Sequence, residues 1–121
     1  MEDLILIVDD ARFARRIETK AASAGFEHIV EAKTAKEALQ IFEEQAPELT
    51  LLDITLPDNS DLTLLRTMIK IRPEAKIVMN SAIGQELIIQ DALNAGARDF
   101  ITKPFKEKEF IEKIVKVMKG N

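Results

Sequence analysis

The segment Leu4-Ile-Leu-Ile-Val-Asp-Asp10 decides the fold class, because an unbroken apolar run leads directly into two adjacent carboxylates. Five consecutive apolar residues without polar alternation are typical of a strand that is buried on both faces. Such strands belong mostly to parallel sheets that carry helices on each side. The segment therefore predicts a buried strand over residues 4–8, with Asp9 and Asp10 at its carboxyl end.

Short apolar runs and helix-periodic segments alternate along the rest of the chain. The further predicted strands are residues 28–32, 49–53, 76–80 and 99–102, and the predicted helices lie around residues 12–24, 34–46, 62–72, 84–95 and 110–118. Strands and helices that alternate in this way predict a doubly wound α/β fold, in which helices cover both faces of a five-stranded parallel sheet. No linker or repeat interrupts the pattern, so we expect one domain over residues 1–121.

Two helices carry recognisable local signals. The first has a stripe of four apolar residues at helical spacing: Phe13, Ile17, Ala21 and Ala24. Gly25 is expected to cap that helix at its C-terminus. Thr34 and Glu37 form a capping box, which predicts a helix start at that point.

The composition excludes several kinds of site and partner. The chain has a net charge of −4, no cysteine and a single histidine, His28, which excludes disulfides, thiolate metal sites and zinc sites built from several imidazoles. No face is basic enough to suggest nucleic acid. No apolar run approaches the roughly 20 residues that span a bilayer, and Met1-Glu-Asp leaves no room for a signal peptide before the first strand. We therefore expect a cytoplasmic protein that binds neither nucleic acid nor membrane.

Polar and charged side chains follow four of the predicted strands, namely Asp9 with Asp10, Asp53, Ser81 and Lys103. Ligands of open α/β sheets bind beyond the carboxyl ends of the strands, so these side chains should converge if their strands are neighbours. Two like charges 4 Å apart repel by about 4 kcal/mol at an effective dielectric constant of 20, which a bound cation relieves. An all-oxygen site suits Mg²⁺, and a neighbouring lysine suits phosphoryl transfer to a carboxylate.

Each of these residues has an ordinary interpretation when it is taken alone. Asp9 and Asp10 could cap the following helix, Asp53 could be a turn residue, and Lys103 could be a solvated loop residue. Ser81 alone is uninformative. The joint placement at strand ends carries the prediction, because coincidence at all four is improbable.

With these residues in place, the chain resembles the receiver-domain family of two-component response regulators over essentially its whole length. The matching segments are residues 4–10, Leu51–Asp53 with Leu56-Pro57, Ser81-Ala82, Gly96-Ala97, and Phe100 with Lys103-Pro-Phe105. Together these motifs are highly specific, although each alone is weak. Residues 9–13 and 81–85 are most similar to single-domain chemotaxis regulators of the CheY type. The resemblance implies a flavodoxin-like sheet with the strand order 2-1-3-4-5.

The resemblance also implies how the site would work. Asp53 would accept a phosphoryl group from the phosphohistidine of a sensor histidine kinase, and Lys103 would pair with that group. Asp10 and Asp53 would bind Mg²⁺ directly, Asp9 would act through water, and the Thr55 carbonyl would complete the protein ligands.

Three further residues have roles in switching that the resemblance implies. Ser81 would move toward the phosphoryl group, and Phe100 would rotate inward behind it, as in a two-state element biased by a local charge change. The bond that joins Lys103 to Pro104 would be cis. The surface built by the helix at 84–95, the strand at 99–102 and the last helix would then bind a downstream protein, either a flagellar motor component or the next protein of a phosphorelay.

The sequence of that surface has two features of its own. Leu87, Ile88 and Ile89 are consecutive, and a helix cannot bury all three on one face, so one of them should face outward. Five lysines give the last helix a basic character: Lys106, Lys108, Lys113, Lys116 and Lys119. A solvated face explains these lysines more simply than a docking patch does.

One position departs from the family pattern. The family usually has glycine eight residues after the acceptor aspartate, where this chain has Asp61. Aspartate tolerates left-handed backbone better than most residues, so we expect the turn to survive, while the departure leaves kinase docking and phosphate lifetime open. Ser81 for threonine and Phe100 for tyrosine lie within the family's usual range. His28 lies on a strand away from the acidic residues, and we expect it to be structural or solvated rather than a phosphohistidine.

Two other functions stay open at this point. A Mg²⁺-dependent phosphohydrolase with an aspartyl nucleophile generally carries a second aspartate two residues after the nucleophile, where this chain has Thr55. A receiver-like adaptor that is never phosphorylated would not need the site, and only Asp61 favours it. We expect a stand-alone, monomeric regulator without a DNA-binding output domain, and the sequence leaves open whether phosphorylation produces a dimer.

Overall fold

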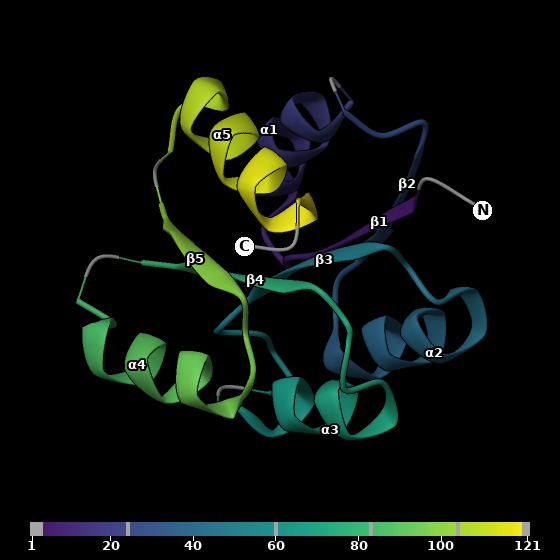
Figure 1. The fold of residues 1–121 in the computed structure, drawn as a ribbon, viewed down its shortest axis with the longest axis vertical. Coiled ribbons are helices and arrows are strands. Elements are labelled where there is room, and N and C mark those ends of the chain that lie inside the picture. The colour runs from purple at the N-terminus through teal and green to yellow at the C-terminus, as the bar shows by residue number, and fades with distance from the viewer. Residues whose placement is uncertain (1–3, 24, 60, 83, 104, 120–121) are drawn as a thin grey trace.

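A computed structural model describes residues 4–23, 25–59, 61–82, 84–103 and 105–119 of the chain. The strands are β1 (Leu4–Val8), β2 (His28–Ala32), β3 (Leu49–Asp53), β4 (Ile77–Ser81) and β5 (Asp99–Thr102). The helices are α1 (Arg12–Ala22), α2 (Ala35–Gln45), α3 (Thr63–Ile71), α4 (Glu86–Ala95) and α5 (Glu107–Met118). The strands form one five-stranded sheet in the order β2-β1-β3-β4-β5, with all neighbours parallel (Figure 1). The predicted α/β class and strand order are confirmed.

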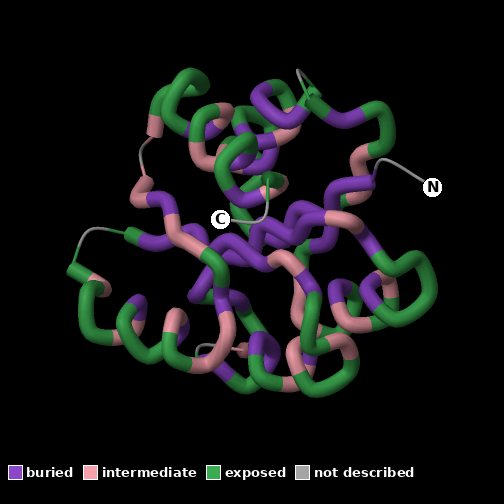
Figure 2. Tube along the Cα trace, in the orientation of Figure 1, coloured by how far each residue is buried: buried purple, intermediate pink, exposed green. Residues whose placement is uncertain are grey.

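The sheet lies between two layers of helices. Figure 1 shows α1 and α5 on one face and α2, α3 and α4 on the other. Alternate side chains of β1 enter different cores, because successive residues of a strand point to opposite faces. Leu6 and Val8 pack into the core beneath α2, α3 and α4, whereas Ile5 and Ile7 pack into the core beneath α1 and α5. The sheet is the buried centre of the molecule (Figure 2), as its apolar runs predict.

The register of the strands brings their carboxyl ends to one edge. Val8 is opposite Leu52, so the residue after β1 lies beside the last residue of β3. Asp53 is opposite Asn80, and Ser81 is opposite Thr102. The residues that follow β1, β3, β4 and β5 therefore come together, as ligand sites in open α/β sheets require.

Helix α2 begins with the predicted Thr34 cap, but the second hydrogen bond of a capping box is made to a different amide. The Thr34 hydroxyl accepts a hydrogen bond from the Glu37 amide at 3.1 Å, and the Glu37 carboxylate accepts one from the Lys33 amide at 2.7 Å. The Glu37 amide of the first turn is thereby satisfied, and the Glu37 carboxylate bonds the residue before Thr34 instead of Thr34 itself. The helix ends at Gln45, and its cap residue Ala46 takes the left-handed conformation with φ 45° immediately before Pro47.

Helix α1 follows the prediction only in part, because Ala21 of the predicted apolar stripe is buried but the first two members of the stripe are exposed. Phe13 is 76% exposed and Ile17 40% exposed, although both belong to the predicted apolar stripe, and Ala24 of that stripe lies outside the described residues. The buried face instead includes Arg15 and Glu18. These polar residues turn inward because the polar carboxyl edge of the sheet offers them hydrogen-bond partners, which a purely apolar face of the sheet would not.

Smaller differences concern boundaries. Helix α1 ends at Ala22 with Ser23 as its cap, two residues before Gly25. Helix α4 begins at Glu86 rather than Gly84, whose φ of 97° is not helical. Gly96 ends α4 as expected, with φ 122°, a conformation that favours glycine. Within the described part of the chain, no helix is long and apolar enough to cross a membrane.

Two phenylalanines differ in burial, so their replacement by alanine should change the free energy of unfolding by very different amounts. Phe110 of α5 is 1% exposed and stacks on Phe105 with ring centroids 5.4 Å apart, so Phe110→Ala should lower the free energy of unfolding by about 3–5 kcal/mol. Phe13→Ala removes the same atoms from an exposed position and should change it by no more than about 0.5 kcal/mol. Urea unfolding followed by circular dichroism measures both, and equal losses would contradict the orientation of α1.

Candidate functional site

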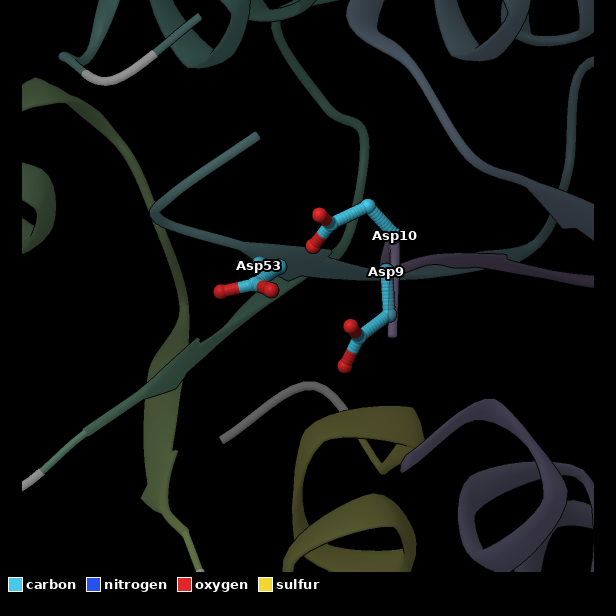
Figure 3. A group of neighbouring side chains, drawn as sticks. All are labelled: Asp9, Asp10 and Asp53. Atoms are coloured by element: carbon cyan, nitrogen blue, oxygen red, sulfur yellow. The ribbon is translucent and has the colours of Figure 1, made fainter. Parts of the chain in front are cut away.

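Three carboxylates form the centre of the site. Asp9 and Asp10 follow β1 and Asp53 ends β3, and one oxygen of each lies within 4.8 Å of the others (Figure 3). The side chains of Asp9 and Asp10 leave the chain in opposite directions in Figure 3. Asp9 is fully buried, Asp53 is nearly so, and Asp10 is exposed. The cluster is thus closed on the Asp9 side and open to solvent on the Asp10 side.

Lys103 joins two of these carboxylates. Its Nζ lies 3.0 Å from Asp9 Oδ2 and 3.1 Å from Asp53 Oδ2. The amide of Lys103 also donates to the Ser81 carbonyl at 2.6 Å, which holds the end of β5 against the end of β4. Burial alone would lower the pKa of Lys103, but the hydrogen bond to Asp9 and the charge of Asp53 outweigh it and raise that pKa. Lys103 therefore stays an ammonium ion between the two acids.

The two buried carboxyl groups are shifted in opposite directions. Burial raises the pKa of Asp53 to about 6, against the charge of Lys103 and helped by the charge of Asp9. Burial would also raise the pKa of Asp9, but hydrogen bonds from Glu18, the Ala11 amide and Lys103 lower it overall. Both groups are mainly ionised at pH 7, which a carboxylate needs in order to bind a cation or attack an electrophile.

Ser81 and Phe100 lie along one groove beside this cluster. Ser81 is the last residue of β4 and is buried, and Phe100 of β5 is half-buried. Both line a groove of about 280 Å³ beneath α4, together with Ile89 and Leu93. The groove gives an aromatic ring room to turn, although the movements predicted for Ser81 and Phe100 stay predictions. Pro104, with its predicted cis bond, lies outside the described residues.

Thr55 links the end of β3 to the loop after β4. Its amide donates to Asp53 Oδ1 at 3.2 Å, and its hydroxyl accepts a hydrogen bond from Gln85 Nε2 at 3.4 Å. Gln85 Oε1 accepts from the Ala82 amide at 2.6 Å, so one side chain connects the loops that follow β3 and β4. Thr55 is exposed beside the cluster, and the metal role of its carbonyl stays a prediction.

Two aspartates of the loop after β3 cap helices. Asp58 accepts hydrogen bonds from the Ala35 and Lys36 amides at 2.7 and 3.1 Å, at the start of α2. Asp61 Oδ1 accepts one from the Thr63 amide at 2.9 Å, at the start of α3. These backbone amides lower the pKa of each aspartate.

The backbone of Asp61 does not take the left-handed conformation, because Ala46 is the one non-glycine residue with a positive φ angle in the described part of the chain. The structure thus accommodates Asp61 by helix capping rather than by the left-handed backbone that its tolerance of that conformation would allow.

The sequence interpretation missed a buried polar pair behind Asp9. Glu18 is 1% exposed and Asn80 is fully buried, and the Asn80 amide group donates a hydrogen bond to Glu18 Oε2. Burial, then the hydrogen bond and charge of Asp9, raise the pKa of Glu18 to about 9. A signal was present in the sequence, since Arg15, Glu18 and Ala22 have the spacing i, i+3, i+7 of one helical face.

A five-stranded parallel sheet with acids and a lysine at its carboxyl edge defines a class of α/β protein, and the match to a known family agrees with it. Residues 5–115 match the model of the response regulator receiver domain. The chain belongs to this family, as the sequence motifs predict.

Similar proteins include single-domain members of that family. The chain is 40% identical to the chemotaxis protein CheY of Bacillus subtilis, over 98% of this chain and 99% of the relative. It is 39% identical to the chemotaxis protein CheY of Thermotoga maritima, over 95% and 97% of the two chains. The receiver domain of NtrX from Brucella abortus superposes with a TM-score of 0.90 at 33% identity, covering 97% of this chain and 99% of that one.

Glu18 makes the stability of the fold depend on pH. Its pKa is raised from 4.5 to about 9, so the folded state holds this proton more tightly than the unfolded chain does. The resulting stabilisation is complete below about pH 4.5 and is lost as the pH rises toward 9. We therefore expect Glu18→Gln to gain about 1 kcal/mol or more in free energy of unfolding over wild type between pH 5 and pH 9.

Urea unfolding at several pH values measures this difference. Glu44→Gln changes an exposed glutamate of α2 and is the matched control, whose difference from wild type should stay nearly constant. A constant difference for Glu18→Gln as well would contradict the burial of Glu18 as a neutral acid.

Proposed function

We propose that this chain is a phosphorylation switch, in which Asp53 accepts a phosphoryl group from the phosphohistidine of a sensor histidine kinase. The contact of Lys103 with both Asp9 and Asp53 carries this proposal, because it places a cation where a phosphoryl group on Asp53 would need one. Membership of the receiver-domain family supports the same function. The chain turns over no external substrate in this proposal.

The donor set fits Mg²⁺. Asp9, Asp10 and Asp53 offer only oxygen atoms, and the exposed side of the cluster leaves room for water and a phosphate. Asp10 and Asp53 would bind the ion directly, Asp9 through water, and Thr55 through its carbonyl. When bound, Mg²⁺ supplies positive charge that neutralises the phosphoryl oxygens.

The transfer itself needs few groups. A carboxylate oxygen of Asp53 forms the new O–P bond while the N–P bond of the phosphohistidine breaks, and the electron pair of that bond returns to the imidazole nitrogen. Lys103 is held beside Asp53 by Asp9, so its ammonium group can follow the charge from the carboxylate to the phosphoryl oxygens. The Ser81 hydroxyl donates one further hydrogen bond to the phosphoryl group.

The output surface is the face formed by α4, β5 and α5. Phe100 turns into the groove beneath α4 as Ser81 moves, and a downstream protein binds the altered face. On this face Leu87 is 87% exposed while Ile89 is buried, so the prediction that one residue of this apolar trio faces outward is confirmed. Lys113 is more than a solvated charge, because its Nζ lies 2.9 Å from Asp99 and 4.9 Å from the centre of the Phe100 ring.

The remaining proposals concern the setting of the switch. We propose that the chain acts in the cytoplasm as a monomeric domain. It is 40% identical to the CheY protein of Bacillus subtilis. That relative is a chemotaxis protein, which favours a flagellar motor component over a phosphorelay protein as the target. His28 begins β2, at the opposite end of the strand from the carboxylates, so it takes no part in the transfer.

Intact mass spectrometry tests the switch directly. After incubation with acetyl phosphate and Mg²⁺, wild type should gain one phosphoryl group, and it should gain none without Mg²⁺ or as Asp53→Asn. Asp58→Asn is the matched control, because Asp58 is an exposed acid of the same loop and should leave the adduct intact.

Other outcomes identify the competing functions. The absence of an adduct in wild type under rapid quench would support the adaptor, and Asp61→Gly is then the first reversion to make. Release of phosphate from small phosphoesters over many turnovers would support the phosphohydrolase instead.

A further inference from the structure

Lys113 of α5 contacts two consecutive residues of β5 at once. Its Nζ lies 2.9 Å from Asp99 Oδ1 and 4.9 Å from the centre of the Phe100 ring. The Lys113 side chain is 35% exposed and that of Asp99 15%, so water is partly excluded from the pair. Partial exclusion of water strengthens both an ion pair and the attraction between a cation and an aromatic ring.

Asp99 fixes the place of this ammonium group. Its Oδ1 also accepts a hydrogen bond from the Phe100 amide at 2.8 Å, which ties the carboxylate to the backbone of its own strand. The ammonium group of Lys113 is paired with that same oxygen. Its position is therefore set by the backbone of β5 and not by the ring of Phe100.

The groove beneath α4 and the base of Lys113 lie on opposite sides of the sheet. β5 is an edge strand, with α5 over one face of the sheet and α4 over the other (Figure 1). The Phe100 ring packs against the core beneath α4 and lines the groove of about 280 Å³ without filling it. Lys113 reaches this ring from α5, around the edge of the sheet. A ring that turned into the groove would leave the ammonium group behind, because Asp99 retains it.

We propose that Lys113, anchored by Asp99, is a positioning residue that holds the Phe100 ring outside the groove beneath α4 and so keeps the domain unswitched until Asp53 is phosphorylated. The inference rests on the proposed function, since the inward turn of Phe100 belongs to the switch described there. It adds the contact that opposes this turn.

The size of the effect follows from the contact. An interaction shifts a two-state equilibrium only by as much as it differs between the states, and the cation lies over the ring in one state alone. A partly shielded contact of this kind changes such an equilibrium by about fivefold. Because coupling is reciprocal, Lys113 also weakens the binding of any group at Asp53 that favours the inward ring, by the same factor.

Four variants isolate the contact. Lys113→Met keeps the apolar stem and removes the cation, whereas Lys113→Arg keeps a cation that can pair with Asp99 and stack on Phe100. Asp99→Asn keeps an acceptor for the Phe100 amide and removes the charge that anchors Lys113. Lys116→Met is the matched control, because it removes an exposed lysine from the same helix. Circular dichroism establishes that each variant folds.

The first measurement is the methyl NMR spectrum of Ile89 and Leu93, which line the groove with Phe100. An aromatic ring that turns toward these methyl groups shifts their resonances. Wild type without ligand gives the reference for the outward ring. Wild type saturated with Mg²⁺ and beryllofluoride, which stands in for a phosphoryl group on Asp53, gives the reference for the inward ring. Phe100→Leu, which lacks the ring, identifies the part of each shift that the ring causes.

The variants should differ without any ligand. We expect the ratio of inward to outward ring to rise about fivefold in Lys113→Met and about twofold or more in Asp99→Asn. Lys113→Arg and Lys116→Met should stay within about twofold of wild type. The affinity for beryllofluoride at saturating Mg²⁺ should rise by the same factor as the ratio in each variant.

Distinct results would overturn the inference. Groove methyl groups that respond to beryllofluoride equally in wild type and Lys113→Met, with an unchanged affinity, would show that Lys113 does not hold the ring. An equal rise in Lys113→Arg or Lys116→Met would show that the contact with Phe100 is not the cause.

Failure of the proposed function gives a different pattern. Wild type that gains no phosphoryl group from acetyl phosphate and whose groove methyl groups ignore beryllofluoride would overturn the switch together with this inference. Wild type that gains the phosphoryl group while these methyl groups stay unchanged would overturn the turn of Phe100 and the role of Lys113, and would leave Asp53 as the acceptor.

Discussion

The ammonium group of Lys103, placed between two buried carboxylates, is the interaction on which the carboxyl edge of this sheet depends. Asp9 and Asp53 lie 3.0 and 3.1 Å from it, and without it two neighbouring buried acids would repel each other or take up protons. These three residues come from the ends of β1, β3 and β5. The parallel register of the central strands is therefore a condition of the chemistry as well as of the fold.

The parts of the structure that could be predicted from the sequence are those that depend on residues close together in the chain. Unbroken apolar runs such as residues 4–8 specify strands buried on both faces. In a parallel sheet the ends of such strands meet at one edge, which is why Asp9, Asp53 and Lys103 could be expected together. The strand order depended on the resemblance to a family, because the alternation of strands and helices alone is compatible with several orders.

The inner face of α1 could not be predicted in the same way. The apolar stripe that contains Phe13 favours one face of the helix, but the structure buries Arg15 and Glu18 instead. Arg15 donates to the Asp9 carbonyl at 2.9 Å and to Glu31 at 3.0 Å, and Glu18 accepts from Asn80. These hydrogen bonds to residues outside the helix decide its orientation, and hydrophobic periodicity carries no information about them.

The aspartates that cap α2 and α3 also determine how the loop after β3 is attached to the rest of the domain. On one side of β3, Asp58 and Asp61 hold the following loop to two helices through charged hydrogen bonds. On the other side, the uncharged Gln85 makes the connection to the segment after β4. Charged hydrogen bonds are the stronger kind. The loop after β3 is therefore held to α2 and α3 by charged hydrogen bonds, whereas its link to the segment after β4 is made by neutral groups alone.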